Sequence, residues 1–472
     1  MNNDVTRRDF CKTSLAGMAG IIAAGSAPSL YAAGANDRIR VACVGYSDRF
    51  RSSLLPCFMH HNKELNFDLV AVADLWRKRL YENAHPEIEA KIGHKVDTYI
   101  SDVELYEKAK DIDAVIISTA DFQHAQHAVN AVNAGKDAYC EKPLAEDMYS
   151  ANMLLDAVNA KRKAGYAPGS ILQIGSQRRS GKKYMAAKEF LNSGKFGDIS
   201  YVHLIWNVNQ PRRWRRPEAL IKSLKQEDID WNLWLLDRDP AEYKFDPRKY
   251  LEFRLFWPFS SGVTGQWMCH QIDTVAWFMG MPYPKSAVSS GGLYQWVDGR
   301  QSFDTFTTVM EYGDSGVKGK GFQVMFQSHQ HNCGGGAKPN NESPVEKYFG
   351  PNGCVDMGTG MVTNEGVERQ KPVSEALPAP QETVVTSANT GGDVLTSAHM
   401  RNWMECVRSR KDPNAPVEAG YSHSVALIMS NAAARTGCKA TFDEEKREVI
   451  AGGKVFKGYK SINDGFFGGL FS

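Results

Sequence analysis

Three polar segments of the sequence hold side chains whose types and spacing could carry out chemistry. Glu141-Lys142-Pro143 places a lysine at the end of an apolar run. A lysine in a buried cleft can exchange protons near neutral pH. His270 lies on an expected helix between Gln266 and Asp273, and Asp273 shares its helix face, so this carboxylate could be its partner. The simpler alternatives are a solvated lysine and a histidine buried in a core.

A turn that could hold a phosphate follows the first apolar run. The usual pattern is G-x-G-x-x-G, but this chain has Gly45-Tyr46-Ser47-Asp48-Arg49-Phe50 and keeps only the first glycine. Gly45 permits the tight turn, and Ser47 is small enough for close approach and can donate a hydrogen bond. Arg49 could supply positive charge, whereas Asp48 opposes phosphate. The turn alone is therefore a weak signal.

Asp74 ends the second apolar run, 29 residues after Gly45. In a dinucleotide-binding fold, an acid at this place hydrogen-bonds the adenosine ribose hydroxyls and disfavours a 2′-phosphate. Asp74 therefore favours NAD over NADP. Its alternative role is to cap the helix that follows, which aspartate also does well.

The hydropathy pattern supplies the scaffold for these residues. Short apolar runs alternate with helix-like stretches, and a weaker pair covers residues 95–110. The runs lie at 38–45, 67–74, 113–119 and 137–140, and the helices at 52–62, 122–134 and 147–164. This alternation indicates a parallel sheet buried on both faces. We therefore predict an α/β fold that begins with a Rossmann-type doubly wound domain over residues 36–173.

The pattern changes after residue 174. Segments of alternating hydropathy indicate an antiparallel sheet with one solvated face. They lie at 200–207, 287–294, 305–311 and 321–328, and helices are expected at 182–192, 396–407 and 422–436. We predict that residues 174–472 form an α+β domain with a large, mostly antiparallel open sheet. Its helices at about 395–436 are expected to pack back towards the first domain.

The first 35 residues are typical of an export signal. Arg7-Arg8 precedes an apolar run at 15–27 and a small-residue site at 33–35, and the pair resembles a twin-arginine signal. The apolar run is too short for a membrane span of about 20 residues. We expect cleavage after Ala35 and a periplasmic or otherwise exported protein without a membrane span. The alternative is an uncleaved amphipathic helix that begins at the arginines.

Composition excludes several classes of protein. The formal net charge of +2 is too small for a general nucleic-acid binder. The cysteines form no C-x-x-C pair, and the spacing of His270, Asp273, His329 and His331 matches no zinc signature. We therefore expect neither nucleic acid nor a metal as a partner.

Two longer segments carry a resemblance to a known family. Thr119-Ala120-Asp121-Phe122-Gln123-His124 and Ala134-Gly135-Lys136-Asp137-Ala138-Tyr139-Cys140-Glu141-Lys142-Pro143 resemble its patterns T-P-x-x-x-H and A-G-K-x-V-x-x-E-K-P. The chain is thereby similar to the Gfo/Idh/MocA oxidoreductases, with Ala120 in place of the usual proline. Segments at 174–179, 231–235, 262–273 and 399–410 extend the resemblance over most of the chain.

The resemblance implies roles for particular residues. Lys142 would lie near the nicotinamide and the substrate hydroxyls. The family's D-x-x-x-H element aligns with Gln266 and His270, so an amide replaces the acid. His124 would shape the cofactor pocket or simply cap its helix. The catalytic candidates are Lys142 and His270. The cofactor candidates are Gly45, Ser47, Arg49, Asp74, Thr119, His124, Glu141, Lys142 and Gln177, and the substrate candidates are Arg178, Arg213, Trp214, Gln266, His270 and Asp273.

Aromatic side chains are dense between residues 231 and 259, and a basic cluster at 212–216 precedes them. Flat rings suit the faces of pyranoses and also suit a subunit interface. Arginines can bind hydroxyl or carboxylate groups, although a solvated basic loop is the simpler interpretation. The two segments could therefore line a sugar site.

The leading hypothesis is an exported NAD(H)-dependent oxidoreductase that acts on a sugar, glycoside or polyol and holds its cofactor tightly. We expect it to be a homo-oligomer, a dimer or tetramer, because relatives of the family commonly associate through the open sheet. One rival is an NAD-dependent glycoside hydrolase or lyase that works through a transient keto-sugar. The other is a carbohydrate-binding protein whose cofactor site has decayed.

Overall fold

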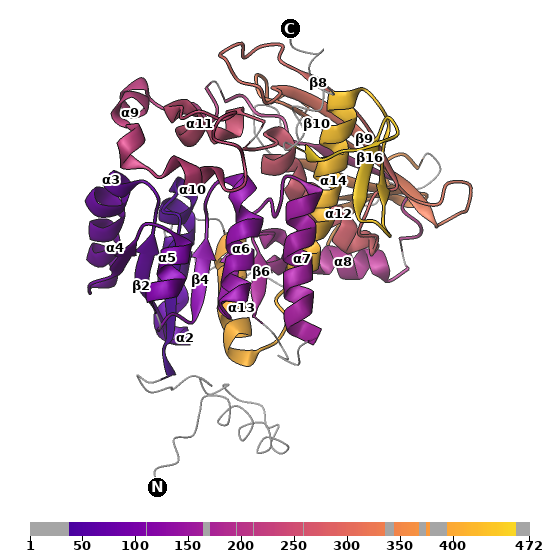
Figure 1. The fold of residues 1–472 in the computed structure, drawn as a ribbon. Coiled ribbons are helices and arrows are strands. Elements are labelled where there is room, and N and C mark those ends of the chain that lie inside the picture. Colours follow the sequence, from indigo (N-terminus) through magenta and orange to yellow (C-terminus); the bar gives the residue numbers. More distant parts are fainter. Residues whose placement is uncertain are drawn as a thin grey trace, which may run out of the picture. The chain divides into compact units, whose positions relative to one another are not determined.

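The computed structural model describes most of the chain beyond the expected signal. The described residues are 37–109, 111–163, 170–194, 196–210, 212–257, 259–335, 344–367, 374–377 and 394–458. The predicted signal over residues 1–35 lies outside them. Ile39–Ser472 forms one unit of the structure, and the fold below is that of this unit (Figure 1).

The first half of this unit is built on a six-stranded parallel sheet with the order β3-β2-β1-β4-β5-β6. Its strands are β1 (Ile39–Val44), β2 (Phe67–Ala73), β3 (Asp97–Tyr99), β4 (Ala114–Ile117), β5 (Asp137–Cys140) and β6 (Leu172–Ile174). The order reverses between β1 and β4. In such sheets, ligands bind at the carboxyl ends of the strands on either side of this switch point. The predicted Rossmann-type sheet is confirmed.

Helices pack against this sheet and start close to their predicted positions. They are α2 (Leu55–Leu65), α3 (Arg77–Arg79), α4 (His85–Ile92), α5 (Asp102–Lys108), α6 (His124–Asn133) and α7 (Met148–Lys163), with short turns η3 (Leu80–Ala84) and η4 (Asp121–Gln123). The helix expected at 52–62 begins instead with a π-helical turn, η2 (Phe50–Leu54). The Phe50 ring is fully buried there. The wider turn accommodates this ring where the usual motif has a glycine.

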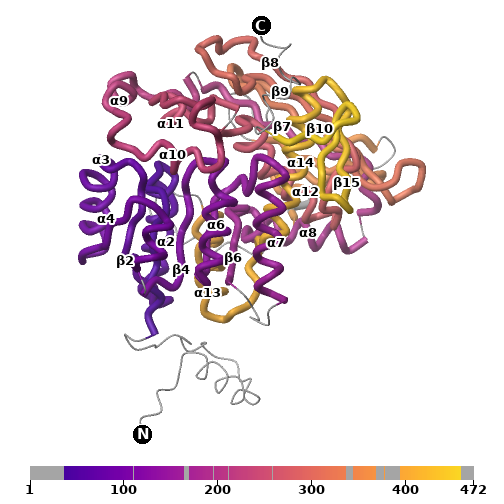
Figure 2. Tube along the Cα trace, in the orientation of Figure 1, coloured from indigo at the N-terminus to yellow at the C-terminus, as the bar shows by residue number. Residues whose placement is uncertain are grey.

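A helix from the far end of the chain completes this half. In α13 (Val394–Ser409), the Trp403 ring contacts the rings of Phe67 and Tyr139. Arg408 also donates to the carbonyl of Asn66 at 2.8 Å. Segments far apart in the sequence therefore pack together, and Figure 2 shows the orange α13 among the indigo and purple elements of the first half.

The second half carries an eleven-stranded sheet with the order β14-β13-β12-β11-β7-β10-β9-β8-β15-β16-β17. Its pairs are antiparallel except β7 with β10, which confirms the predicted mostly antiparallel sheet. The strands are β7 (Tyr201–Ile205), β8 (Ser286–Gly292), β9 (Thr305–Gly313), β10 (Gly321–His329), β11 (Val345–Gly350), β12 (Gly353–Asp356), β13 (Met361–Thr363), β14 (Ser374–Ala376), β15 (Ala440–Asp443), β16 (Glu448–Ala451) and β17 (Lys454–Val455). Burial alternates along β9 and β10, as predicted for a sheet with one solvated face.

Three helices, α8 (Lys182–Asn192), α12 (Cys269–Met279) and α14 (Val417–Thr436), belong to this half. The last was expected at 422–436 but starts at Val417, immediately after Pro416. Nearly every residue of α14 is buried, so its first turns lack the polar face that marks a helix in a sequence. Among the described helices, none has the length and apolar character needed to cross a membrane.

Residues 212–257 form a separate layer, which we call the cap, at the carboxyl edge of the parallel sheet (Figure 1). It contains α9 (Glu218–Ser223), η6 (Gln226–Asp228), α10 (Trp231–Leu235), α11 (Pro247–Leu251) and η7 (Phe253–Leu255). Its aromatic side chains pack with Trp76, Ala120 and Phe122 of the first half. Most rings of the dense aromatic segment thus attach the cap to the Rossmann domain, a role that the sequence did not indicate.

Candidate functional site

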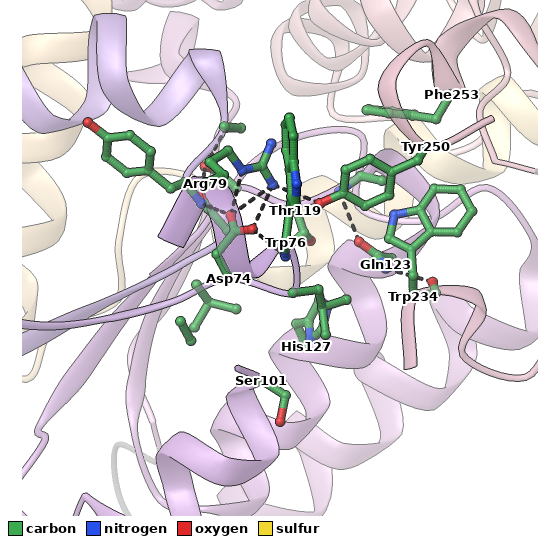
Figure 3. A pocket seen from close by; sticks show the side chains of 18 of the residues that line it. Asp74, Trp76, Arg79, Ser101, Thr119, Gln123, His127, Trp234, Tyr250 and Phe253 are labelled. Atoms are coloured by element: carbon green, nitrogen blue, oxygen red, sulfur yellow. Dashed lines mark hydrogen bonds and ion pairs between the residues drawn. The ribbon is translucent and has the colours of Figure 1, made fainter. Parts of the chain in front are cut away.

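A cleft of about 420 Å³ opens at the carboxyl ends of β1, β2 and β4. The Rossmann domain provides its floor, including Gly45, Ser47, Asp74 and Thr119. The cap provides the opposite wall, with Trp234, Tyr250 and Phe253 (Figure 3). The cleft therefore lies at the switch point of the sheet, where a dinucleotide is expected.

The turn after β1 needs its single glycine. Gly45 has a φ of +87°, and a Cβ added to it would lie 2.7 Å from the Cγ2 atom of Thr119. Ser47 contacts Ser118 through their hydroxyl oxygens at 2.8 Å, and its hydroxyl accepts from the amide of Phe50 at 3.2 Å. The turn is therefore closely packed although it lacks the other two glycines.

Asp74 is held by the protein's own donors. Its carboxylate accepts from the backbone amides of Tyr46 at 2.8 Å and Trp76 at 2.9 Å. The Arg79 guanidinium donates to both of its oxygens, at 3.1 and 2.9 Å. Arg79 also donates to the Tyr250 hydroxyl of the cap at 2.9 Å, as Figure 3 shows. The predicted ribose-binding acid thus lines the cleft as one half of an ion pair.

Arg49 and Glu141 form a second ion pair, 3.0 Å between Nε and Oε1. Arg49 also donates to Ser53 and to Thr396 of α13. Burial of Glu141 opposes its ionisation, but the charges of Arg49 and Lys142 hold its pKa below the ordinary value. The Arg49 guanidinium is therefore directed towards other side chains of the protein, and the Glu141 carboxylate balances its charge.

Lys142 reaches across from the Rossmann domain to the second domain. Its Nζ donates to the backbone carbonyl of Gln266 at 2.9 Å. Gln266 lies in η8 (Thr264–Met268), a π-helical turn that leads directly into α12. Such turns are frequent at functional sites because they alter how the backbone carbonyls are paired. This turn sets Lys142 close to the start of the helix that carries His270.

His270 is the second predicted catalytic residue, and it lies in the same region. Burial lowers the pKa of His270 well below its ordinary value, and the positive charges of Lys142 and Arg178 lower it further. The imidazole is therefore neutral near pH 7 and can accept a proton. We call Lys142, Gln266 and His270 the Lys142 cluster.

Tryptophan rings and arginines surround His270. The Trp206 ring lies 5.7 Å from the His270 ring and 6.3 Å from the ring of Trp267, centroid to centroid. Trp214 lies 5.6 Å from Trp267. The predicted substrate residues Arg178 and Arg213 lie over these rings, Arg178 over Trp206 and Arg213 over Trp214 and Trp267. Trp206 was not predicted; it lies within the expected strand at 200–207, directly after β7, and only its aromatic side chain could have marked it.

Asp273 has a different partner from the one predicted. Arg179 donates to both of its oxygens, at 2.9 to 3.1 Å. His423 lies 3.9 Å away, and the Asp273 side chain is 1% exposed. Arg179 and His423 hold the pKa of Asp273 below its ordinary value although burial opposes this. The Asp273 carboxylate connects α12 to the short 3-10 turn that contains Arg179, η5 (Gln177–Ser180), and it is not paired with His270.

His124 contacts the turn that follows β5 and contains Lys142. Its Nδ1 hydrogen-bonds to the Pro143 carbonyl at 2.8 Å, and burial lowers its pKa. Three predicted cofactor residues also have a buried polar atom without a hydrogen-bond partner in the described part of the chain. These atoms are Thr119 Oγ1, His124 Nε2 and Gln177 Oε1. Buried polar atoms are usually satisfied, so these residues fit a polar cofactor such as NAD.

No group of three or more His, Cys, Asp or Glu side chains that could hold a metal ion occurs within the described residues. A parallel sheet with its cleft at the switch point, followed by a domain that brings a histidine towards a lysine, is typical of the class of dinucleotide-dependent oxidoreductases. Comparison with known proteins then identifies the family.

Residues 39–168 match the model of an oxidoreductase family with an NAD-binding Rossmann fold, and residues 243–441 match the C-terminal alpha/beta domain of the same family. The chain belongs to the Gfo/Idh/MocA family of oxidoreductases. Its cofactor is accordingly NAD.

Curated relatives share part of their length with this chain. The inositol 2-dehydrogenase of Salmonella typhimurium is 32% identical over 185 residues, which cover 39% of this chain and 51% of the relative. Inositol 2-dehydrogenase 2 of Saccharopolyspora erythraea is 33% identical over 130 residues, covering 27% of this chain and 36% of that protein. The chain thus spans about half the length, or less, of these relatives.

Solved structures match over more of the fold. The aldose-aldose oxidoreductase of Caulobacter crescentus, in complex with glycerol, is 16% identical with a TM-score of 0.58, covering 86% of this chain and 100% of that chain. The WlbA dehydrogenase of Bordetella pertussis, in complex with NADH and UDP-GlcNAcA, is 16% identical with a TM-score of 0.58, covering 86% and 99%. At this identity the likeness establishes the shared fold.

Proposed function

We propose that this chain catalyses NAD(H)-dependent oxidation or reduction of a secondary hydroxyl or keto group of a sugar, glycoside or polyol. The observation that carries the proposal is the Lys142 cluster, in which a lysine contacts the turn that leads to a neutral histidine. The names of the relatives, inositol 2-dehydrogenase and aldose-aldose oxidoreductase, support this substrate class.

Different side chains activate the substrate, accept its proton and bind its ring. NAD supplies the hydride acceptor when bound. The Lys142 ammonium donates a hydrogen bond to the reacting oxygen, and the His270 imidazole accepts the hydroxyl proton. Trp206 and Trp214 offer flat faces to a sugar ring, and Arg213 offers donors for its hydroxyls.

We further propose that the nucleotide stays bound between turnovers and is recycled in place. The cap supports this, because it forms the wall of the cleft opposite the parallel sheet. The Arg79–Tyr250 hydrogen bond, the Gln123–Trp234 hydrogen bond and the ion pair of Asp48 with Arg216 all join the cap to the cleft floor. Release of a dinucleotide would require some of these contacts to break.

Retention of the cofactor suits the proposed location. A periplasmic or otherwise exported enzyme has no free NAD pool, so a bound and recycled cofactor is what the expected twin-arginine-type signal would require. We also propose a homo-oligomer, a dimer or tetramer, with a small molecule as substrate and no nucleic-acid partner.

One experiment tests the function. The purified protein is denatured, and released nucleotide is identified by absorbance and mass. The intact protein is then incubated with myo-inositol, D-glucose and methyl glucosides, and products are identified by mass and NMR. Bound NAD(H) with a stable keto product supports the proposal. Sugar release from a glucoside without net NADH would replace it with the redox-assisted hydrolase or lyase. Absence of both bound NAD(H) and affinity for added NAD would leave the carbohydrate-binding alternative.

A further inference from the structure

A buried carboxylate lies behind the Lys142 cluster. Asp121 is the first residue of η4, directly after β4, and its side chain has no exposed surface. Its Oδ2 accepts from the Nε2 of Gln266 and from the hydroxyl of Ser260, both at 2.6 Å. The Nη2 of Arg254, from the cap, lies 3.6 Å from Oδ1. Asp121 thus accepts hydrogen bonds from η8 and from the segment just before η8, and it is paired by charge with Arg254 of the cap.

Gln266 links Asp121 to Lys142 by two different atoms. Its side-chain amide donates to Asp121, and its backbone carbonyl accepts from Lys142 Nζ. The side chain of Gln266 is therefore anchored in the Rossmann domain at the place where its carbonyl receives the lysine. A change at Asp121 would alter both the position of the η8 turn and the charge near the ammonium group.

A second buried carboxyl group, that of Glu146, lies near Asp121 and adds no second charge beside it. Glu146 faces Ser261 and Gly265. Burial raises its pKa well above the ordinary value, and the carboxylate of Asp121 raises it further. Glu146 therefore stays protonated near neutral pH, because two adjacent carboxylates would repel each other. The other titratable or charged groups around the pair are Arg254 on η7, His124 on α6, Asp147 beside Glu146, Lys142, and Cys269 at the start of α12.

We propose that Asp121 is a positioning residue for Lys142: it anchors the η8 turn through Gln266 and supplies a negative charge behind the lysine. This inference rests on the proposed role of Lys142. Gln266 provides the contact, and Asp121 provides the charge.

The test measures the reactivity of Lys142 itself. The full-length protein as purified, with and without added NAD, is treated with trace acetic anhydride from pH 6 to 10, and acetylation is quantified by mass spectrometry. Asp121→Asn is nearly isosteric, so it removes the charge and retains a hydrogen-bond acceptor. We expect Lys142 to be acetylated about threefold faster or more at neutral pH, because the ammonium form loses a stabilising charge.

An internal control separates charge from general loosening. Lys136 also donates to a backbone carbonyl, that of Ile112, and lies at the opposite end of β5. Its acetylation should not change. The variant Glu146→Gln should leave Lys142 within about twofold of the parent rate at neutral pH, because Glu146 is already uncharged there.

A charge swap provides the rescue. Adding Gln266→Asp to Asp121→Asn returns a carboxylate to η8, and the Lys142 rate should fall back to within about twofold of the parent. Gln266→Met breaks the same contact from the other side. It leaves the Asp121 carboxylate in place, so it should raise the Lys142 rate less than Asp121→Asn does, by releasing the carbonyl that binds the ammonium group. It carries the test of this anchoring if Asp121→Asn does not fold.

The inference is overturned by any of three results: an unchanged Lys142 rate in Asp121→Asn and Gln266→Met, an equal rise at Lys136, or no recovery in the swap. Acetylation requires no substrate and no turnover. The proposed function can therefore fail while this inference stands, and the reverse also holds.

Discussion

The cleft around Asp74 and the Lys142 cluster handle charge in opposite ways. At Asp74, every oxygen of the carboxylate is bound by protein donors, and the side chain is 1% exposed. At the Lys142 cluster, the ammonium has a neutral carbonyl as its partner, and the histidine stays neutral. In the first region an arginine pairs directly with the carboxylate, whereas in the second the ammonium binds a carbonyl and has carboxylates only nearby.

The difference indicates a division of labour. Ion pairs and aromatic contacts hold the Asp74 region of the floor to the cap, through Arg79, Tyr250 and Trp234. A buried group with a shifted pKa is a candidate for a role in chemistry, and His270 of the Lys142 cluster is such a group. We therefore expect changes at the first region to affect nucleotide retention, and changes at the second to affect turnover.

The largest effect is expected for Lys142→Ala. Turnover with the best substrate of the sugar panel should fall by at least about a thousandfold, because the donor to the reacting oxygen is lost. The nucleotide content after purification should be unchanged. Lys136→Ala serves as the control, since that lysine also binds a carbonyl but lies away from the cleft. Turnover retained in Lys142→Ala would refute the assigned role.

His270→Gln should lower turnover by about a hundredfold, since an amide cannot accept the proton. The pH profile gives a sharper test. The pKa of His270 is lowered, so the imidazole stays neutral and active as the pH falls through its ordinary value of about 6.5. We expect turnover to persist below that pH and to be lost only when the lowered pKa is reached. An acid limb at or above pH 6.5 would contradict the neutral base.

At the Asp74 region, Trp234→Ala should release nucleotide about tenfold faster or more. The Trp234 ring packs against Phe122 at 5.0 Å, Phe259 at 4.6 Å and Tyr250 at 5.6 Å, so its loss loosens the cap. Release is measured by dilution into a nucleotide scavenger, with hydride transfer followed in a single turnover. The rate of hydride transfer should change by less than about threefold, which keeps the two regions distinct.

Tyr250→Phe isolates one contact of the same wall. It removes only the hydroxyl that Arg79 reaches at 2.9 Å, and release should quicken by about twofold to tenfold. Tyr243→Phe is the matched control, because Tyr243 is a buried phenol of the cap outside the residues that line the cleft. Equal effects of the two substitutions would mean that the Arg79 contact has no special part in retention.

The smallest effect is expected at the solvent-exposed rim of the cleft, where Arg216 and Asp48 lie. Arg216 and Asp48 form an ion pair of 2.7 Å, but their side chains are 36% and 57% exposed. Pairs this open to solvent contribute little, so Arg216→Ala should change nucleotide release by no more than about twofold. A larger change would place the retaining contact at the rim instead of at the Trp234 wall.

The parts of the fold that follow from local patterns could be predicted. Apolar runs such as 113–119 and alternating segments such as 305–311 predicted the two sheets, since each pattern depends only on residues close together in the chain. The start of α14 at Val417 was not predicted, because a helix buried on nearly all sides lacks the continuous polar face that marks a helix in a sequence.

The candidate site was harder to predict from the sequence than the fold, for a related reason. Its residue types were visible, but their partners lie far along the chain, as with Lys142 and Gln266, which are 124 residues apart. The Asp273–Arg179 pair replaced the predicted Asp273–His270 pair, although sequence spacing favoured the latter. Asp121 had no motif of its own, and its role depends on two contacts that only folding creates.

The contact of Arg49 with Thr396 also bears on the order of synthesis. The cleft floor begins at residue 45, its wall arrives with the cap at residues 212–257, and α13 supplies Thr396 to Arg49 from 347 residues downstream. Long-range contacts of this kind form late and slow the folding of a chain. Synthesis must therefore pass residue 396 before all contacts of the cleft floor can form, and loading of NAD should follow that point.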